Sequence, residues 1–276
     1  MDFAFTEEQQ MIRDTAAAFL AEVSDSAAVR RAMATEKGYD AELWQRICRE
    51  MYWQAIHAPE AVGGMGLGYV EVVAMMEQMG RFLLCSPYLS TVCMAGNALL
   101  VAGDDTQKAG WLGKVCAGEA TGALAFSAGG SRWDAACISA TWRETDDGFV
   151  LNGEYRYVID GHTADFLVVA AREAGSEGAE GISLFVLPAD SPGVARQWLP
   201  TMDQARKQAS IVLDDVRLSR EALLGEPGKG WPALSRVLDL ATIALAGEQV
   251  GGCQRLLDMT VEYTGERVQF NRTIAS

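Results

Sequence analysis

Twice along this chain the spacing of the apolar residues changes, and this change constrains the fold more than any other feature. Residues 1–119 carry apolar side chains at the three- and four-residue spacing of a helical face. Residues 121–224 carry short apolar runs separated by turn residues, which is typical of strands. After Pro232 the helical spacing returns. We therefore expect an α+β multidomain protein with an N-terminal α-helical domain over 1–119, a middle β-barrel or sandwich over 120–228, and an incomplete C-terminal helical bundle over 229–276.

The N-terminal part carries recognisable helix signals. Thr6 with Gln9 three residues later predicts a capping box ahead of the first helix. A Gly-rich loop over 58–68 separates two of the later helices. Those later helices are predicted over 40–51, 69–82, 89–101 and 104–116.

In the middle part, alternation and turn signals together predict the strands. The run from Cys137 to Trp142 alternates, and Asp146-Asp147-Gly148 indicates a hairpin. Asn152-Gly153 indicates a second turn. Further strands are predicted over 155–159, 166–170, 182–187 and 210–213.

A long helix is predicted from Ala233 to about Arg267, where no proline interrupts the pattern. Gly247, Gly251 and Gly252 weaken it slightly, and in a buried helix such glycines usually allow close packing against a neighbour. A helix of this length needs partner helices to bury its faces. We expect those partners beyond residue 276, in a helical domain that this sequence contains only in part.

Charge and composition exclude several classes of protein. The net charge of −14 argues against nucleic acid and anionic membrane surfaces as partners, because Lys and Arg carry phosphate binding. The six cysteines include no C-x-x-C pair and only two histidines occur, so we expect no zinc site. We expect buried, reduced thiols in a cytoplasmic protein without a signal peptide. The longest apolar run, 237–253, contains Asp239 and Glu248, so no membrane span is predicted.

Short patterns along the whole chain resemble those of one enzyme family. Pro59-Glu60 precedes Gly63-Gly64-Met65-Gly66, Asn152-Gly153 precedes Tyr157-Val158, and Leu224-Gly225-Glu226 precedes Gly228-Lys229-Gly230. Tyr263, Arg267, Gln269-Phe270 and Ile274 follow the spacing Y-x-x-x-R-x-Q-F-G-x-x-I, with Asn271 at the glycine. These patterns resemble acyl-CoA dehydrogenases. The segments 123–126 and 131–134 look most like the small subunit of pimeloyl-CoA-type enzymes, or like subunits that act on steroid side chains.

The resemblance implies an FAD-dependent oxidoreductase that desaturates an acyl-CoA thioester between its α- and β-carbons. Hydride goes to N5 of the flavin, and electrons then pass to an electron-transferring flavoprotein. The resemblance also implies a homotetramer or a heterotetramer with another acyl-CoA dehydrogenase subunit. An acyl-CoA oxidase is a further alternative with the same architecture.

The resemblance assigns one set of residues to the flavin. It places Phe126 and Ser127 against the pyrimidine side of the ring, with Ser131 near the phosphates and Arg132 near the substrate. The alternative for this stretch is a Gly-rich strand end with a solvated Arg. Tyr157 replaces a tryptophan that packs on the flavin face, and an aromatic ring preserves that contact. Ile159 replaces a threonine whose hydroxyl would bond N5 of the flavin. The sequence therefore leaves open whether this subunit contacts the flavin at N5.

A second set lies near the end of the chain. Arg267 and Phe270 resemble residues that reach the FAD of a neighbouring subunit, where the guanidinium pairs with the pyrophosphate. The alternative for Arg267 is a surface residue at a helix end. Asn271 tolerates the left-handed conformation, so we expect the turn there to be kept.

The catalytic base is not identified by the sequence. One position that carries the glutamate in the family corresponds to Ala241, its arginine neighbour corresponds to Thr242, and the other position would lie beyond residue 276. Asp239 matches a residue that lines the acyl-CoA pocket. Glu248 is a candidate base if burial raises its pKa, and otherwise a carboxylate bonded to a partner helix or exposed at a subunit interface. The missing base leaves an alternative, a non-catalytic partner that completes the FAD site of another subunit.

Overall fold

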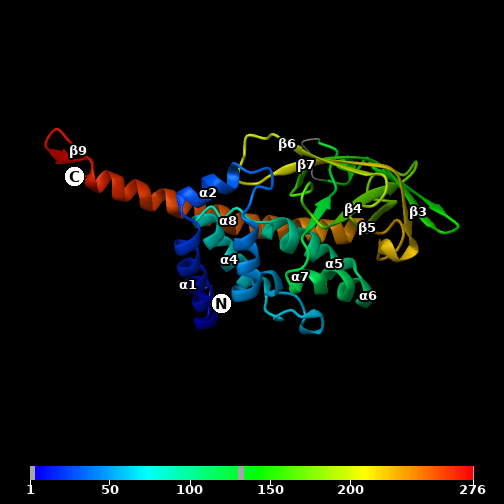
Figure 1. Ribbon diagram of the computed structural model, residues 1–276, viewed down its shortest axis with the longest axis horizontal. Helices are drawn as coiled ribbons and strands as arrows, with labels where there is room; N and C mark the ends of the chain where they lie inside the picture. The colour runs from blue at the N-terminus through cyan, green and yellow to red at the C-terminus, as the bar shows by residue number, and fades with distance from the viewer. Residues whose placement is uncertain (1–3, 130–133, 276) are drawn as a thin grey trace. The chain divides into compact units, whose positions relative to one another are not determined.

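The computed structural model describes residues 4–129 and 134–275, and many of its elements are labelled in Figure 1. The chain forms two compact units. The first contains residues 1–29, 68–84 and 243–276, and the second contains residues 30–67 and 85–242. Secondary structure changes from helical to β between residues 116 and 122 and back to helical between 224 and 231. The helical–β–helical order predicted from the apolar spacing is therefore confirmed.

The first unit is built from α1 (Glu7–Val23), α4 (Tyr69–Arg81) and the later part of α8 (Trp231–Glu266). Helix α1 begins with the predicted capping box. The N–H of Gln9 donates to Thr6 Oγ1 at 3.2 Å, and the N–H of Thr6 donates to Gln9 Oε1 at 3.0 Å. An ion pair between Arg13 and Glu77, 2.6 Å long, links α1 to α4. The capping box satisfies the N–H groups of Thr6 and Gln9 at the start of α1.

Helices α4 and α8 approach each other closely because glycines stand at their contact. A Cβ atom at Gly80 would overlap the backbone carbonyl of Glu248, and one at Gly251 would overlap the carbonyl oxygen of Glu77. A Cβ at Gly247 would lie 2.9 Å from Val73 Cγ1. The close packing predicted for the α8 glycines is confirmed for Gly247 and Gly251, whereas Gly252 has only one atom nearby, at 3.7 Å.

The helices of the second unit are short and several contain π-helical turns. The predicted helix over 40–51 is α-helical only at first, and the one over 89–101 begins as a π-helix. The segment predicted over 104–116 is also split. Helix α2 (Ser26–Met33), which is divided between the two units, is absent from the sequence-based predictions. Besides the start of α8, the described residues of this unit contain the short helices α3 (Ala41–Arg46), η1 (Ile47–Met51), η2 (Trp53–Ala55), η3 (Glu60–Val62), η4 (Leu89–Gly96), α5 (Asn97–Ala102), α6 (Asp105–Gln107), η5 (Lys108–Leu112), α7 (Gly113–Cys116), η6 (Ala135–Cys137) and η7 (Arg220–Ala222).

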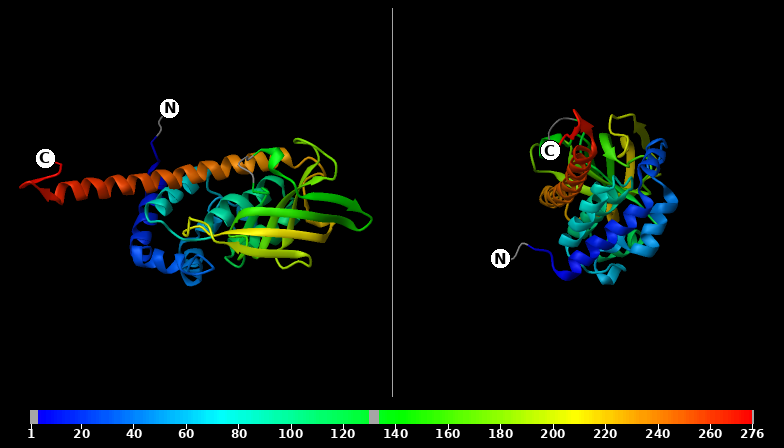
Figure 2. Two further views of the ribbon diagram at one scale, coloured as in Figure 1. Left: turned by 90° about the horizontal axis from the view of Figure 1, so that it is seen from above. Right: turned by 90° about the vertical axis from the view of Figure 1, so that its left-hand side faces the viewer.

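The strands of the second unit form one sheet of eight strands in the order β6-β7-β3-β2-β4-β5-β8, with β1 paired to β4. The sheet is open at β6 and β8 within the described residues, so the strands do not close into a barrel. Strands β3, β6 and β7 run side by side (Figure 2). The strands are β1 (Gly122–Ala125), β2 (Thr141–Thr145), β3 (Gly148–Ile159), β4 (Phe166–Glu173), β5 (Ile182–Pro188), β6 (Val194–Leu199), β7 (Gln208–Ser219) and β8 (Leu223–Leu224).

One of the two turns predicted in the sheet is present and the other is not. The hairpin at Asp146-Asp147 is confirmed, because Thr145 pairs with Gly148. The second turn predicted at Asn152-Gly153 is wrong: both residues lie inside β3, at a register shift against β7. Gly153 has φ +150°, and a Cβ there would come within 2.5 Å of Ala140, so the glycine serves a bulge. The strand predicted from Cys137 is also wrong in its start, because β2 begins at Thr141.

Strands β4 and β5 are buried on both faces along most of their length. Leu167 and Val169 of β4 point into an apolar cluster within the curved sheet, together with Phe149 and Phe185. The alternate residue Phe166 is also buried, and its ring lies 5.2 Å from that of Trp111 in η5. This double burial makes β4 a rigid base for the elements beside it.

The burial of the cysteines agrees with the sequence-based expectation only in part. Four cysteines are buried, but Cys137 is half-buried and Cys253 is exposed, so the expectation of buried thiols is wrong for Cys253. Within the described ranges 4–129 and 134–275, no helix combines the length and apolar character needed to cross a membrane.

We predict that Gly251→Ala destabilises the protein by about 1–3 kcal/mol, because the new methyl group overlaps the Glu77 carbonyl oxygen. Gly252→Ala on the same helix is the matched control. Its methyl group has room, so it should raise the free energy of unfolding by about 0.5–1 kcal/mol. Urea unfolding of both variants tests the α4–α8 contact, and equal effects would contradict it.

Candidate functional site

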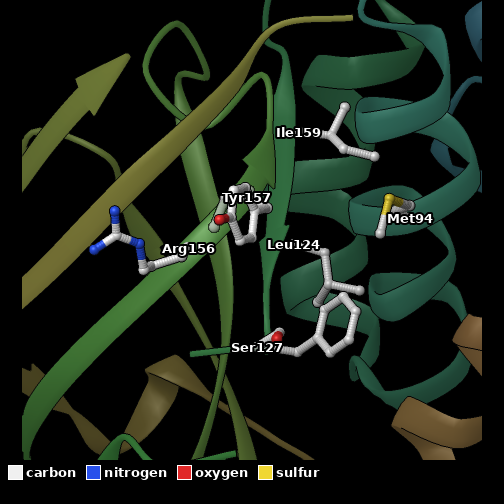
Figure 3. Close-up of a pocket in the computed structure, with 8 residues that line it drawn as sticks. Met94, Leu124, Ser127, Arg156, Tyr157 and Ile159 are labelled. Carbon is white, nitrogen blue, oxygen red and sulfur yellow. The ribbon is translucent and has the colours of Figure 1, made fainter. Parts of the chain in front are cut away.

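A small hollow in the second unit brings together several of the residues predicted to face a flavin. Its volume is about 70 Å³. One wall comes from η4, one from the end of β1, and one from β3 (Figure 3). We call it the β1–β3 pocket, and its lining residues are Met94, Leu124, Phe126, Ser127, Arg156, Tyr157, Val158 and Ile159.

A bulge in β3 shapes this pocket. The pairing of β3 with β7 shifts register between Tyr155 and Val158. The N–H of Arg156 donates to the carbonyl of Ser127 at 2.9 Å, which joins β3 to the segment after β1. Tyr157 follows with φ +60° and is 53% exposed. A left-handed backbone is uncommon for an aromatic residue and costs on the order of 1–3 kcal/mol, so the surrounding pairing must hold it.

The floor of the pocket is apolar. Met94, Leu124 and Phe126 are buried, and Ile159 is half-buried. In Figure 3, Ile159 and Met94 lie on the side of η4, whereas Arg156 extends away from the other labelled side chains. An apolar floor beside an exposed tyrosine ring can receive the edge of a flat aromatic ring system.

Polar groups at the pocket are few. Ser127 Oγ accepts a hydrogen bond from the N–H of Gly129 at 3.2 Å. Its hydroxyl also bonds the thiol of Cys137, whose pKa is raised mainly by burial and lowered by that bond. The Ile159 side chain supplies no hydrogen-bond donor. The pocket thus has a mainly apolar lining, with Ser127, Arg156 and Tyr157 as its polar side chains and no hydroxyl at position 159.

A buried carboxylate stands directly behind the pocket wall. Asp160 follows Ile159, has φ +53°, and its Oδ2 accepts a 2.6 Å hydrogen bond from Ser90 Oγ of η4. Burial raises the pKa of Asp160 to about 6, although the Ser90 bond and the charge of Arg206 lower it. The negative charge of Asp160 in turn helps raise the pKa values of Tyr39 and Cys85, although burial is the larger cause for both.

The candidates on α8 lie elsewhere. Asp239 is exposed, and Ala241, at 6% exposure, is buried; neither lines the β1–β3 pocket. The hydroxyl of Thr242 donates to the carbonyl of Leu238 at 2.7 Å. Glu248 belongs to the first unit and is half-buried where its backbone faces Gly80. Its role as a base stays a prediction.

The end of the described chain is a two-residue hairpin in the first unit. Strands β9 (Val268–Gln269) and β10 (Arg272–Thr273) pair with Gln269 opposite Arg272. Phe270 and Asn271 between them both have positive φ, +53° and +63°, as a type I′ turn requires. The turn expected at Asn271 is thus kept. Phe270 is 97% exposed and Arg267 is exposed, so both side chains are accessible to another molecule.

Sequence reasoning found part of this site. Phe126, Ser127, Tyr157 and Ile159 come together as the resemblance implies. Ser131 and Arg132 lie outside the described residues. Met94, Arg156, Ser90 and Asp160 were missed, and only the approach of η4 to β3 in space could have revealed Ser90 and Met94. Among the described residues, no three His, Cys, Asp or Glu side chains gather in a way that could hold a metal ion.

Family models match the chain in three consecutive stretches. They are the acyl-CoA dehydrogenase N-terminal domain over residues 6–119, the middle domain over 123–216 and the C-terminal domain over 228–276. The acyl-CoA dehydrogenase IpdE2 of Mycobacterium tuberculosis is 32% identical over 270 residues, covering 98% of this chain and 68% of that protein. Across eight similar curated proteins, the chain spans between 53% and 72% of each protein's length.

Solved structures show the same fold along the whole chain. The ChsE4-ChsE5 complex from Mycobacterium tuberculosis superposes with a TM-score of 0.88 at 27% identity, covering 100% of this chain and 71% of that one. Butyryl-CoA dehydrogenase from Megasphaera elsdenii gives a TM-score of 0.90 at 25% identity, covering 100% and 73%.

We predict that Asp160 makes stability fall as pH rises. Its folded pKa of about 6 lies above its ordinary value of 3.8, so the folded state favours the protonated acid. The ionised carboxylate lowers the free energy of unfolding, and this cost is absent when the pH is below the ordinary pKa. The cost is complete when the pH is above the folded pKa, where it reaches about 2–3 kcal/mol. Asp160→Asn should therefore be more stable than the wild type at about pH 8 but not at about pH 4. Thermal melts across this range test the sign, and a difference that does not grow with pH would contradict it.

Proposed function

Because the chain belongs to the acyl-CoA dehydrogenase family, we propose that it is a subunit of an FAD-dependent acyl-CoA dehydrogenase in which it forms a wall of the flavin site. FAD is the cofactor of this family, and when bound it accepts the hydride that the acyl thioester loses from its β-carbon. The observation that carries the proposal is the β1–β3 pocket, where four residues assigned to the flavin by resemblance meet.

The residues of the pocket have separate roles in this proposal. Tyr157 presents an exposed ring on which the flavin can pack, and Phe126 and Leu124 exclude water from the floor. Ser127 offers its hydroxyl and the adjacent backbone to the polar edge of the ring. The pocket is smaller than a whole flavin, so these residues hold one part of it and the remainder needs other surfaces.

Further contacts of the proposed enzyme rest on the resemblance. Asp239 and Arg132 would contact the acyl-CoA, and Ser131 the phosphate groups. Arg267 and Phe270 would reach the FAD of a neighbouring subunit in a homo- or heterotetramer, which their exposure permits. We propose a cytoplasmic location and an electron-transferring flavoprotein as the electron acceptor.

A second function is favoured by two specific observations: the chain completes the FAD site of a catalytic partner subunit. Ala241 stands where one glutamate position of the family is expected, and it is buried and apolar. Ile159 stands where the resemblance expects a hydroxyl, and it lines the pocket. One similar structure is a complex of two differently named chains, ChsE4 and ChsE5, which supports a search for such a partner.

We predict that Tyr157→Ala weakens FAD binding about tenfold, because a stacked aromatic contact contributes about 1 kcal/mol or more. Tyr157→Phe is the matched control and should bind FAD as the wild type does, since the ring remains. Quenching of flavin fluorescence measures both affinities. If the purified wild-type protein shows no flavin band and takes up no added FAD, the wall in this chain does not hold flavin alone.

Co-expression with the product of the neighbouring gene distinguishes the two functions. If the chain completes a partner's site, acyl-CoA-dependent dye reduction should appear only in the mixture. Glu248→Gln should leave that activity unchanged, because the partner supplies the base. If the chain alone reduces dye as fast as the mixture, the partner role is wrong, and loss of activity in Glu248→Gln would then assign the base.

A further inference from the structure

The three walls of the β1–β3 pocket are joined behind the lining by two neighbouring hydroxyl groups. Thr91 Oγ1 of η4 accepts from the N–H of Gly122 at 3.1 Å and lies 3.3 Å from its carbonyl, which ties η4 to β1. Ser90 Oγ donates to Asp160 Oδ2 at 2.6 Å, which ties η4 to the end of β3. Ser90 lies four residues before Met94, and Asp160 directly follows Ile159, so the second bond joins two opposing sides of the pocket.

Asp160 is held so that its carboxylate cannot shift easily. Its N–H donates to the carbonyl of Lys207 at 3.0 Å, and its own carbonyl accepts from Thr163 and Ala164 at 3.0 and 3.1 Å. Ser90 is 0% exposed, and its oxygen also lies 3.1 Å from the Pro87 carbonyl. A hydroxyl has one proton, and the shorter bond goes to the carboxylate, which is the stronger acceptor.

We propose that Ser90 and Asp160 are a positioning pair that sets the spacing of η4 and β3 and thereby the shape of the flavin pocket. The identity of the occupant rests on the proposed function; the pair itself does not. Neither side chain lines the pocket, so the pair acts through Met94 on one side and through Tyr157 and Ile159 on the other.

The choice of a carboxylate supports a role in positioning. A buried carboxylate is costly, and the raised pKa of Asp160 records that cost. The charged and titratable groups around it are Arg206, Tyr39 and Cys85, together with Lys207, whose carbonyl holds the Asp160 backbone. What the carboxylate provides in return is a short, charge-assisted bond of fixed geometry. Asp also suits the positive φ at this position better than most residues.

Amide hydrogen exchange tests the pair without any flavin when it is measured in the element across the pocket from the substituted residue. Ser90→Ala should speed exchange about fivefold in the peptide over 155–165, and Asp160→Gly should do so in the peptide over 85–97. Glycine adopts the positive φ without strain, so a change in η4 cannot come from local backbone strain at residue 160. Asp160→Asn keeps an oxygen acceptor but loses the charge-assisted bond, so it should speed exchange in the 85–97 peptide less than Asp160→Gly does.

Ser183→Ala is the matched control. Ser183 is also a fully buried serine with one close bond, accepted from the N–H of Gly228 at 2.8 Å, but it lies on β5 and does not line the pocket. It should change neither peptide. Unchanged exchange across the pocket in both Ser90→Ala and Asp160→Gly would overturn the proposal. If one of these variants fails to fold, the other decides alone.

A flavin measurement then connects the pair to the cofactor. With a wild-type protein that binds FAD, Ser90→Ala should raise the Kd for FAD about tenfold and alter the visible flavin band, while Ser183→Ala changes neither. Wild-type protein that binds no FAD would count against a flavin site formed by this chain alone, and the exchange result would still decide the pair. Faster exchange with unchanged FAD affinity and band would show a purely structural bond and overturn the positioning role.

Discussion

The bulge at Arg156 and Tyr157 is the constraint on which the candidate site depends. In an unbroken pairing with β7, the side chains of β3 would simply alternate between the two faces of the sheet. The bulge breaks that alternation, sends the Arg156 N–H to the Ser127 carbonyl, and leaves the Tyr157 ring exposed beside the pocket. The positive φ of Tyr157 persists because regular pairing resumes at Val158, opposite Ala209.

A rigid core makes such a strained feature possible. Strand β4 is buried on both faces, and β1 pairs with it in register from Gly122 to Ala125. The segment that follows β1 therefore leaves the sheet from a fixed place, so Phe126 and Ser127 reach the pocket in one orientation. Helix η4 is bound to β1 through Thr91 and to the end of β3 through Ser90. Packing and hydrogen bonding thus act together to fix the pocket before any ligand binds.

The sequence predicted the parts of this arrangement that depend on local pattern. The capping box at Thr6 and the hairpin at Asp146-Asp147 follow from spacing over a few residues, and both are present; of the α8 glycines, Gly247 and Gly251 are closely packed. Asn152-Gly153 misled, because the same residues that favour a tight turn also favour a bulge within a strand. Ser90 and Asp160 are 70 residues apart, and no local pattern signals a bond between them.

In the proposed function, the task of holding a cofactor is separate from the task of reacting with a substrate. Groups that give the site its shape are present: the bulge, the exposed ring of Tyr157, the hydroxyl of Ser127 and the bond between Ser90 and Asp160. Polar side chains expected at two positions, 159 and 241, are replaced by apolar ones. Shape depends on packing and backbone register, which an apolar substitution leaves intact, whereas proton transfer and a bond to N5 need a particular atom at one place. A subunit can therefore lose proton transfer and the bond to N5 while it retains the shape of the pocket. A partner subunit with the missing groups could then bind against a wall that is already formed.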